Sequence, residues 1–165
     1  ELKGDLESSG CRVSVPQLPT PQNQTLENWL RVLEQYQFDI GVGHSLGGTA
    51  LFRYLERNDV RLRALYTVAT AISMEGIVDY EGKGDLGSFL AHPFDWDLIR
   101  RHVDRFCVFH SEDDPLVNVA HAYRLAQHLG AELTELIVLA DAGHFNEASR
   151  YRSFDLLLKK IKENL

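Results

Sequence analysis

The sequence has few cysteines and no arrangement of residues typical of a metal site. Only two of its 165 residues are cysteine, and both Cys11 and Cys107 lie in or at the start of an apolar, strand-like stretch. We interpret them as buried free thiols, because two isolated cysteines make no disulfide framework. With no second cysteine nearby and no histidines paired at ligand spacing, we expect no metal site, and we predict no other cofactor.

Long apolar runs and an excess of basic residues are also missing. No stretch approaches the roughly 18 apolar residues that a membrane-spanning helix needs, and residues 1–5 do not resemble a signal peptide. A net charge of -7 leaves no basic face that could follow a phosphate backbone. We therefore expect a cytoplasmic protein that acts on a small molecule, with no nucleic-acid or membrane partner. The 44% hydrophobic content suits a single globular domain over residues 1–165.

Strand and helix patterns alternate along the chain. Short apolar stretches predict strands at residues 11–15, 38–42, 62–69, 106–110 and 133–139. Apolar residues at helical spacing predict helices at residues 26–36, 49–56, 96–102, 119–129 and 147–162, and residues 2–7 as the last turns of another helix. Residues 71–94 have four glycines and no sustained period, which indicates an irregular excursion. This alternation predicts an α/β fold with a mainly parallel sheet between two layers of helices.

A G-x-S-x-G motif, Gly43-His44-Ser45-Leu46-Gly47, joins the strand at 38–42 to the helix that follows. This setting is typical of a nucleophile elbow, a sharp turn that exposes the serine hydroxyl, with small residues on either side to avoid a clash. Ser45 is therefore the candidate nucleophile, and the backbone N–H of Leu46 is a candidate donor to an oxyanion. The alternative is a turn serine or helix-capping serine in a glycine-rich loop.

Two later strands are also followed by polar residues of catalytic type. Asp113 and Asp114 come after the strand at 106–110, and His144 follows the strand at 133–139. Because the carboxyl ends of parallel strands meet at one edge of a sheet, we expect these residues to lie near Ser45. His144 would accept the serine proton and Asp114 would orient His144, with Asp113 as the alternative acid. Otherwise the two aspartates cap a loop and His144 is an ordinary surface histidine.

The same segments resemble a known family. Residues 18–30, 43–47, 94–99, 111–117 and 143–145 resemble the small α/β-hydrolases of the retinoblastoma-binding protein nine type, most specifically in Ser-Glu-Asp-Asp and Gly-His-Phe. The resemblance covers nearly the whole chain. It implies an α/β-hydrolase fold with little or no lid, an activity similar to that of carboxylesterases, and Asp114 as the acid.

The resemblance departs at the N-terminal end. The family begins with a strand, a glycine-containing loop and the first part of a helix, and Glu1 falls inside that helix. We therefore expect the N-terminal βα unit to be missing from this chain, with the strands at 11–15 and 38–42 flanking its place. The loop of that unit usually supplies a second oxyanion donor, and its loss would weaken transition-state binding by about 3 kcal/mol.

These observations predict a serine hydrolase that cleaves small carboxylic esters through an acyl-enzyme. Thioesterase or acyltransferase activity remains an alternative, because those reactions pass through the same kind of oxyanion. A second alternative is a non-catalytic interaction module that keeps the hydrolase fold and binds a protein partner. The apolar residues of the excursion form either a pocket wall or ordinary packing; they are Met74, Ile77, Tyr80, Phe89 and Phe94.

Overall fold

A parallel β-sheet forms the centre of the computed structural model, which describes residues 2–78, 85–151 and 153–165. In these residues the strand order is β1-β2-β3-β4. The strands are β1 (Ile40–His44), β2 (Ala64–Val68), β3 (Phe106–Ser111) and β4 (Thr134–Leu139). The helices are α1 (Leu2–Ser8), α2 (Leu26–Leu33), α3 (Leu46–Arg57), α4 (Gly87–Leu90), α5 (Trp96–Arg101), α6 (Ala120–Leu129), the 3-10 helix η1 (Glu147–Ser149) and α7 (Asp155–Lys162).

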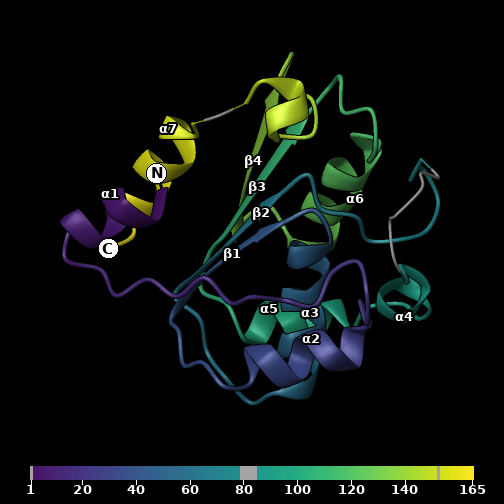
Figure 1. Cartoon of the computed structure of the whole chain (residues 1–165), viewed down its shortest axis with the longest axis horizontal. Helices are drawn as coiled ribbons and strands as arrows, with labels where there is room; N and C mark the ends of the chain where they lie inside the picture. The colour runs from purple at the N-terminus through teal and green to yellow at the C-terminus, as the bar shows by residue number, and fades with distance from the viewer. Residues whose placement is uncertain (1, 79–84, 152) are drawn as a thin grey trace.

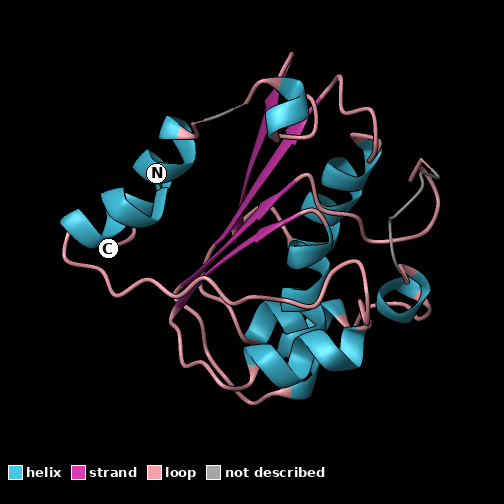
Figure 2. Cartoon of the chain, in the orientation of Figure 1, coloured by secondary structure: helices cyan, strands magenta, loops and turns pink. Residues whose placement is uncertain are grey.

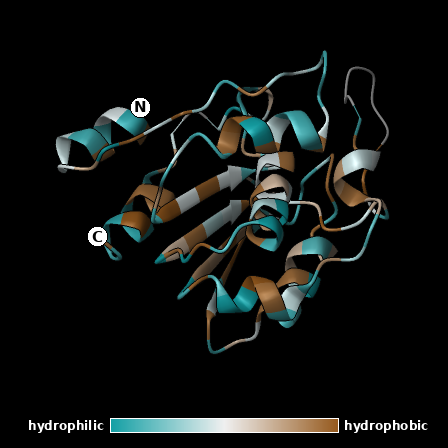
Figure 3. Ribbon diagram, turned by 90° about the horizontal axis from the view of Figure 1, so that it is seen from below, coloured by the Kyte–Doolittle hydropathy of each residue, from teal (hydrophilic) through white to brown (hydrophobic). Residues whose placement is uncertain are grey.

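Helices cover both faces of the sheet, which confirms the predicted α/β fold and its layers. In Figures 1 and 2, α2 to α6 lie on one side of the strands, while α1 and α7 pack together on the other side, where the two chain ends lie. Each face has its own cluster of buried apolar side chains. The helices are amphipathic and the inner strands are largely hydrophobic, as the colouring in Figure 3 shows.

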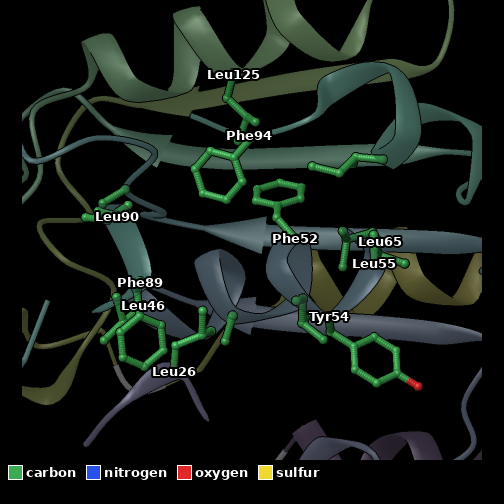
Figure 4. Close-up of a cluster of buried hydrophobic side chains, with 14 of the residues drawn as sticks. Leu26, Leu46, Phe52, Tyr54, Leu55, Leu65, Phe89, Leu90, Phe94 and Leu125 are labelled. Carbon is green, nitrogen blue, oxygen red and sulfur yellow. The ribbon is translucent and has the colours of Figure 1, made fainter. Parts of the chain in front are cut away.

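The two central strands send alternate side chains into the two clusters. Leu65 of β2 and Val108 of β3 belong to the larger cluster, whereas Tyr66 and Cys107 belong to the one under α1 and α7. This follows from the period of two along a strand. Figure 4 shows Phe52 of α3 in the larger cluster, and the side chain is fully buried. Burial raises the pKa of the free thiol of Cys107 to about 12, so it stays protonated at neutral pH.

The register of the sheet brings the carboxyl ends of the strands to one edge. His44 at the end of β1 pairs with Val68 of β2, and Ser111 at the end of β3 pairs with Leu139 of β4. The segments that follow the strands therefore start next to one another, as expected for parallel strands. This edge carries the candidate site.

The predicted strand at 11–15 is wrong, because residues 11–20 have no regular secondary structure. Cys11 and Val13 do pack partly against the smaller cluster, and Arg12 is exposed, so the alternation is that of a strand. A strand also needs a neighbour that shares its backbone hydrogen bonds. In the described part of the chain β1 pairs only with β2, and nothing pairs with residues 11–15.

The predicted helix at 147–162 is also wrong, because the segment is divided into η1 and α7. Arg150 ends η1 in the left-handed conformation, with φ 59°, which an α-helix cannot continue. Asn146 caps η1 by accepting a hydrogen bond from the backbone N–H of Ser149. None of the described helices is long and apolar enough to cross a membrane.

Candidate active site

Ser45 occupies a strained turn between β1 and α3. Its backbone angles are φ 53° and ψ -123°, and its N–H donates to the carbonyl of Val68 at 2.7 Å. A positive φ at a residue other than glycine is costly, and such residues are concentrated at functional sites. Although Ser45 stands at the N-cap position of α3, its side chain makes no capping hydrogen bond. The geometry therefore favours an elbow over the capping alternative.

The close packing of this turn depends on Gly43 and Gly48. A Cβ on Gly43 would lie 2.5 Å from the Cα and N of Gly48, and a Cβ on Gly48 would lie 2.1 Å from Oγ1 of Thr70. Both distances are too short for any side chain. Gly47 has open space around its Cβ direction. The sequence predicted that a side chain would clash at both glycines of the motif. This prediction is met at Gly43 and wrong at Gly47, because the crowded glycine on that side is Gly48.

His144 and Asp114 come together at the same edge of the sheet. The Nδ1 atom of His144 lies 2.9 Å from Oδ2 and 3.1 Å from Oδ1 of Asp114. The Asp114 side chain is fully buried and that of His144 nearly so. Burial would raise the pKa of the Asp114 carboxyl, but hydrogen bonds from His144 and from the N–H groups of Val117 and Leu116 outweigh it and lower this pKa. An ionised Asp114 can therefore fix the ring of His144 with a proton on Nδ1.

Asp113, the alternative acid, makes different contacts. Its Oδ1 accepts hydrogen bonds from Ser111 Oγ at 2.6 Å and from the N–H of Gly143 at 2.8 Å. The bond from Ser111, followed by that from Gly143, lowers the pKa of the Asp113 carboxyl. Asp113 thus holds the backbone of the loop that carries His144, whereas Asp114 contacts the imidazole.

A cavity of about 210 Å³ connects the candidate residues. Ser45 and His144 both line it, and the Ser45 hydroxyl makes no hydrogen bond to any described residue. His44 and Gly47 also line the cavity, as do Thr20 and Gln24 of the loop before α2. The remaining lining residues are apolar: Trp29, Leu46, Ala71, Ile77, Leu86, Leu116 and Val117. The structure therefore brings a serine, a histidine and, behind the histidine, an aspartate to one small and mainly apolar cavity.

Leu46 also lines this cavity, and it is the first residue of α3. The N–H of the first residue of a helix has no acceptor within the helix, and the partial positive charge of the helix end lies there. The backbone of Leu46 is thus suited to bind a negatively charged oxygen next to Ser45.

Thr20 and Gln24 also line the cavity, and no sequence motif pointed to either of them. The hydroxyl of Thr20 donates to Oε1 of Gln24 at 2.6 Å, and the indole of Trp29 donates to the carbonyl of Pro19 at 2.7 Å. These bonds shape the loop that closes one side of the cavity. The run of prolines and polar residues in 16–24 was a signal for an ordered loop, but local pattern does not show which strand end a loop approaches.

The excursion after β2 contributes to both the cavity and the core. Ile77 lines the cavity, whereas Phe89 and Phe94 are buried in the larger core cluster and Met74 is exposed. The buried guanidinium of Arg53 fixes the excursion by donating to the carbonyl of Phe89 at 2.9 Å. Tyr80 lies outside the described residues. Both alternatives for this segment therefore apply: Ile77 forms part of the pocket wall, whereas Phe89 and Phe94 pack in the core.

Three other histidines brace the loops at this edge through Nε2. His44 contacts the carbonyl of His144, His110 that of Val117, and His121 that of Glu75. A carbonyl only accepts, so each ring carries its proton on Nε2. Burial lowers the pKa of His110 and of His121, which keeps both neutral at pH 7. Within residues 2–78, 85–151 and 153–165, no three His, Cys, Asp or Glu side chains are placed to hold a metal ion.

Comparison with protein families decides the broader classification. The model described as "Serine hydrolase" matches residues 2–163. The chain belongs to the serine hydrolase family. This confirms the resemblance inferred from the sequence motifs, and it makes hydrolysis the activity to be expected of the chain.

Individual relatives are similar over nearly the whole chain. YdeN of Bacillus subtilis (strain 168) is 27% identical over 161 residues, which cover 94% of this chain and 82% of YdeN. The serine hydrolase RBBP9 of Rattus norvegicus is 26% identical over 167 residues, covering 99% of this chain and 83% of RBBP9. The crystal structure of the B. subtilis ydeN gene product superposes with a TM-score of 0.84 at 24% identity, covering 99% of this chain and 87% of that one. The fold of this serine hydrolase is thus that of solved α/β proteins.

Proposed function

We propose that this serine hydrolase cleaves small carboxylic esters through an acyl-enzyme on Ser45. The observation that carries the proposal is the buried His144–Asp114 pair at the cavity that Ser45 also lines. His144 is the proposed general base, and Asp114 is the proposed group that orients it. Both roles follow from the contacts of each side chain and from the chemistry that an ester requires.

The proposed reaction starts with proton transfer. With its Nδ1–H donated to Asp114, the ring of His144 has a free lone pair on Nε2. Nε2 takes the proton of Ser45 Oγ while Oγ attacks the ester carbonyl carbon. The tetrahedral intermediate then collapses, and His144 returns the proton to the departing alkoxide. A water molecule, activated by His144 in the same way, releases the acid and restores Ser45.

The negative oxygen of the intermediate needs donors that are already in place. The N–H of Leu46 is the proposed first donor, because it follows the nucleophile and lies at the start of α3. The polar side chains of Thr20 and Gln24 line the same cavity on the side of the loop before α2.

The cavity favours a small, mainly apolar acyl or alcohol group. Its volume is about 210 Å³, and Trp29, Ile77 and Leu86 are among the apolar residues that line it. No Asp, Glu, Lys or Arg side chain of the described residues lines this cavity, so nothing in it favours a charged substrate. Thioesters are the second proposed class, because they share the oxyanion and the leaving-group chemistry. The cytoplasmic location stays a prediction from the sequence.

Fluorophosphonate labelling followed by intact mass measurement tests the nucleophile. We expect the unchanged protein to gain one adduct and Ser45→Ala to gain none, because the probe reacts only with an activated serine hydroxyl. Ser8→Ala is a matched control, since Ser8 is exposed on α1 and bonds only to the carbonyl of Gly4. Equal labelling of Ser45→Ala would remove the nucleophile assignment, and a protein without any labelling would favour the interaction module.

Turnover of p-nitrophenyl acetate, butyrate and decanoate then tests the substrate class. Given the small cavity, we expect kcat/KM to be highest for the two short esters and to fall for decanoate. The corresponding acetyl thioester is measured beside them. A preference for decanoate would contradict the small-ester proposal, and a higher kcat/KM for the thioester would change the substrate class to thioesters.

A further inference from the structure

His44 forms a direct link between the turn that carries Ser45 and the loop that carries His144. Its Nε2 lies 2.7 Å from the carbonyl oxygen of His144, 100 residues away in the sequence. The two imidazole rings are also in contact, with centroids 4.8 Å apart and an angle of 56° between the planes. Among the described residues, no other hydrogen bond joins residues 43–48 to residues 140–146.

We propose that His44 is a positioning residue that sets the separation between Ser45 and His144 through its hydrogen bond to the His144 carbonyl. This inference rests on the proposed function, because it concerns the same serine and histidine. The role is distinct from base catalysis, since His44 carries its proton on the Nε2 that faces the carbonyl.

His144 is held at three points, and only one of them involves the turn at Ser45. Its N–H donates to Oγ of Ser149, and its Nδ1 contacts Asp114. These two contacts fix the loop and the ring orientation relative to β3 and to η1. The carbonyl contact with His44 is the one that fixes His144 relative to the nucleophile.

The separation matters because proton transfer between Ser45 and His144 needs a heavy-atom distance of about 2.6 to 3.2 Å. A misplacement of about 1 Å can reduce a rate by roughly 100-fold. The backbone around Ser45 is fixed by its strained turn and by the bond from its N–H to Val68. Without the hydrogen bond from His44, only the contacts with Ser149 and Asp114 would hold His144 in place.

His44 can be replaced without disturbing the core. The residue is exposed at the end of β1, the strand at the sheet edge in the described part of the chain. Phenylalanine keeps a ring against His144 but has no donor. Glutamine can place an amide N–H near the position of Nε2 and so restore the donor without a titrating group.

The test compares wild type, His44→Phe and His44→Gln in steady-state turnover of p-nitrophenyl acetate, in the rate of fluorophosphonate labelling and in melting temperature. We expect His44→Phe to lower kcat and the labelling rate by about 10- to 100-fold, with KM changed by less than about 3-fold. His44→Gln should recover most of the loss. His92→Phe is the control for replacing an exposed histidine, since the His92 side chain does not line the cavity.

The outcomes separate this inference from the proposed function. A His44→Phe variant as fast as wild type, or a His44→Gln variant as slow as His44→Phe, overturns the positioning role. A loss in His44→Phe that appears in KM instead of kcat also overturns it, because it would indicate a role in substrate binding. Failure of the Ser45→Ala test would refute the proposed function itself, whatever His44 does.

Discussion

Replacing Asp114 by asparagine should change the protonation of His144 while it preserves the shape of the site. Asp114 Oδ1 accepts the N–H groups of Leu116 and Val117 at 2.8 and 3.0 Å, and an asparagine carbonyl oxygen can keep both bonds. The NH2 group then stands where Oδ2 faces Nδ1 of His144 at 2.9 Å. Because NH2 is a donor, His144 must offer an unprotonated Nδ1 and carry its proton on Nε2. In that tautomer His144 cannot accept the proton of the serine.

The expected loss in kcat is about 10,000-fold, the size of effect that a wrong histidine tautomer has in a serine protease. At about 1.4 kcal/mol for each factor of ten, this corresponds to roughly 5 kcal/mol of lost transition-state stabilisation. The free energy of unfolding should fall by only about 1.5 to 3 kcal/mol, since one hydrogen bond to a charged group is lost. The Asp114→Asn variant should therefore lose nearly all of its activity while it remains folded.

Asp113→Asn is the matched control. Asp113 uses one oxygen to accept from Ser111 and Gly143, and an asparagine oxygen can accept both bonds. We expect kcat to fall by less than about 10-fold. The assay is turnover of p-nitrophenyl acetate together with urea unfolding of both variants. The reverse ranking would move the acid to Asp113, and an Asp114→Asn variant within tenfold of wild type would refute an orienting role for Asp114.

Two further predictions concern stability. Gly48→Ala should lower the free energy of unfolding by about 1 to 3 kcal/mol, because the new methyl group would clash with Thr70. Gly47→Ala, in open space on a helix, should raise the free energy of unfolding by up to about 1 kcal/mol. Equal effects of the two substitutions in urea unfolding would contradict the packing described for the elbow. The second prediction is that stability falls between pH 7 and pH 5. Burial lowers the pKa of His121 in the folded protein below its ordinary 6.5. Between pH 7 and pH 5 the unfolded chain therefore binds more protons than the folded protein, and the stability present at pH 7 is lost as the pH falls. His121→Gln should flatten the profile of melting temperature against pH, and an unchanged slope would show that His121 is not responsible.

Much of the fold could be predicted from the sequence because its signals are local. The apolar faces of α2 and α6 and the short apolar strands β2 and β3 lie within a few residues of where the patterns place them. The strand prediction at 11–15 failed for a non-local reason. Its alternation of side chains was correct, but a strand exists only where another strand accepts and donates its backbone hydrogen bonds.

By itself, the sequence determined the α/β architecture, the elbow around Ser45 and the order in which the aspartates and His144 follow their strands. These depend on periodicity and on short motifs, which act within one element and its adjoining turn. The tertiary structure alone decided which aspartate faces the imidazole, which glycine is crowded, and that His44 reaches the carbonyl of His144. Each of these depends on a contact between segments far apart in the chain, and hydrogen-bond distances of about 3 Å are set by packing that no local pattern encodes.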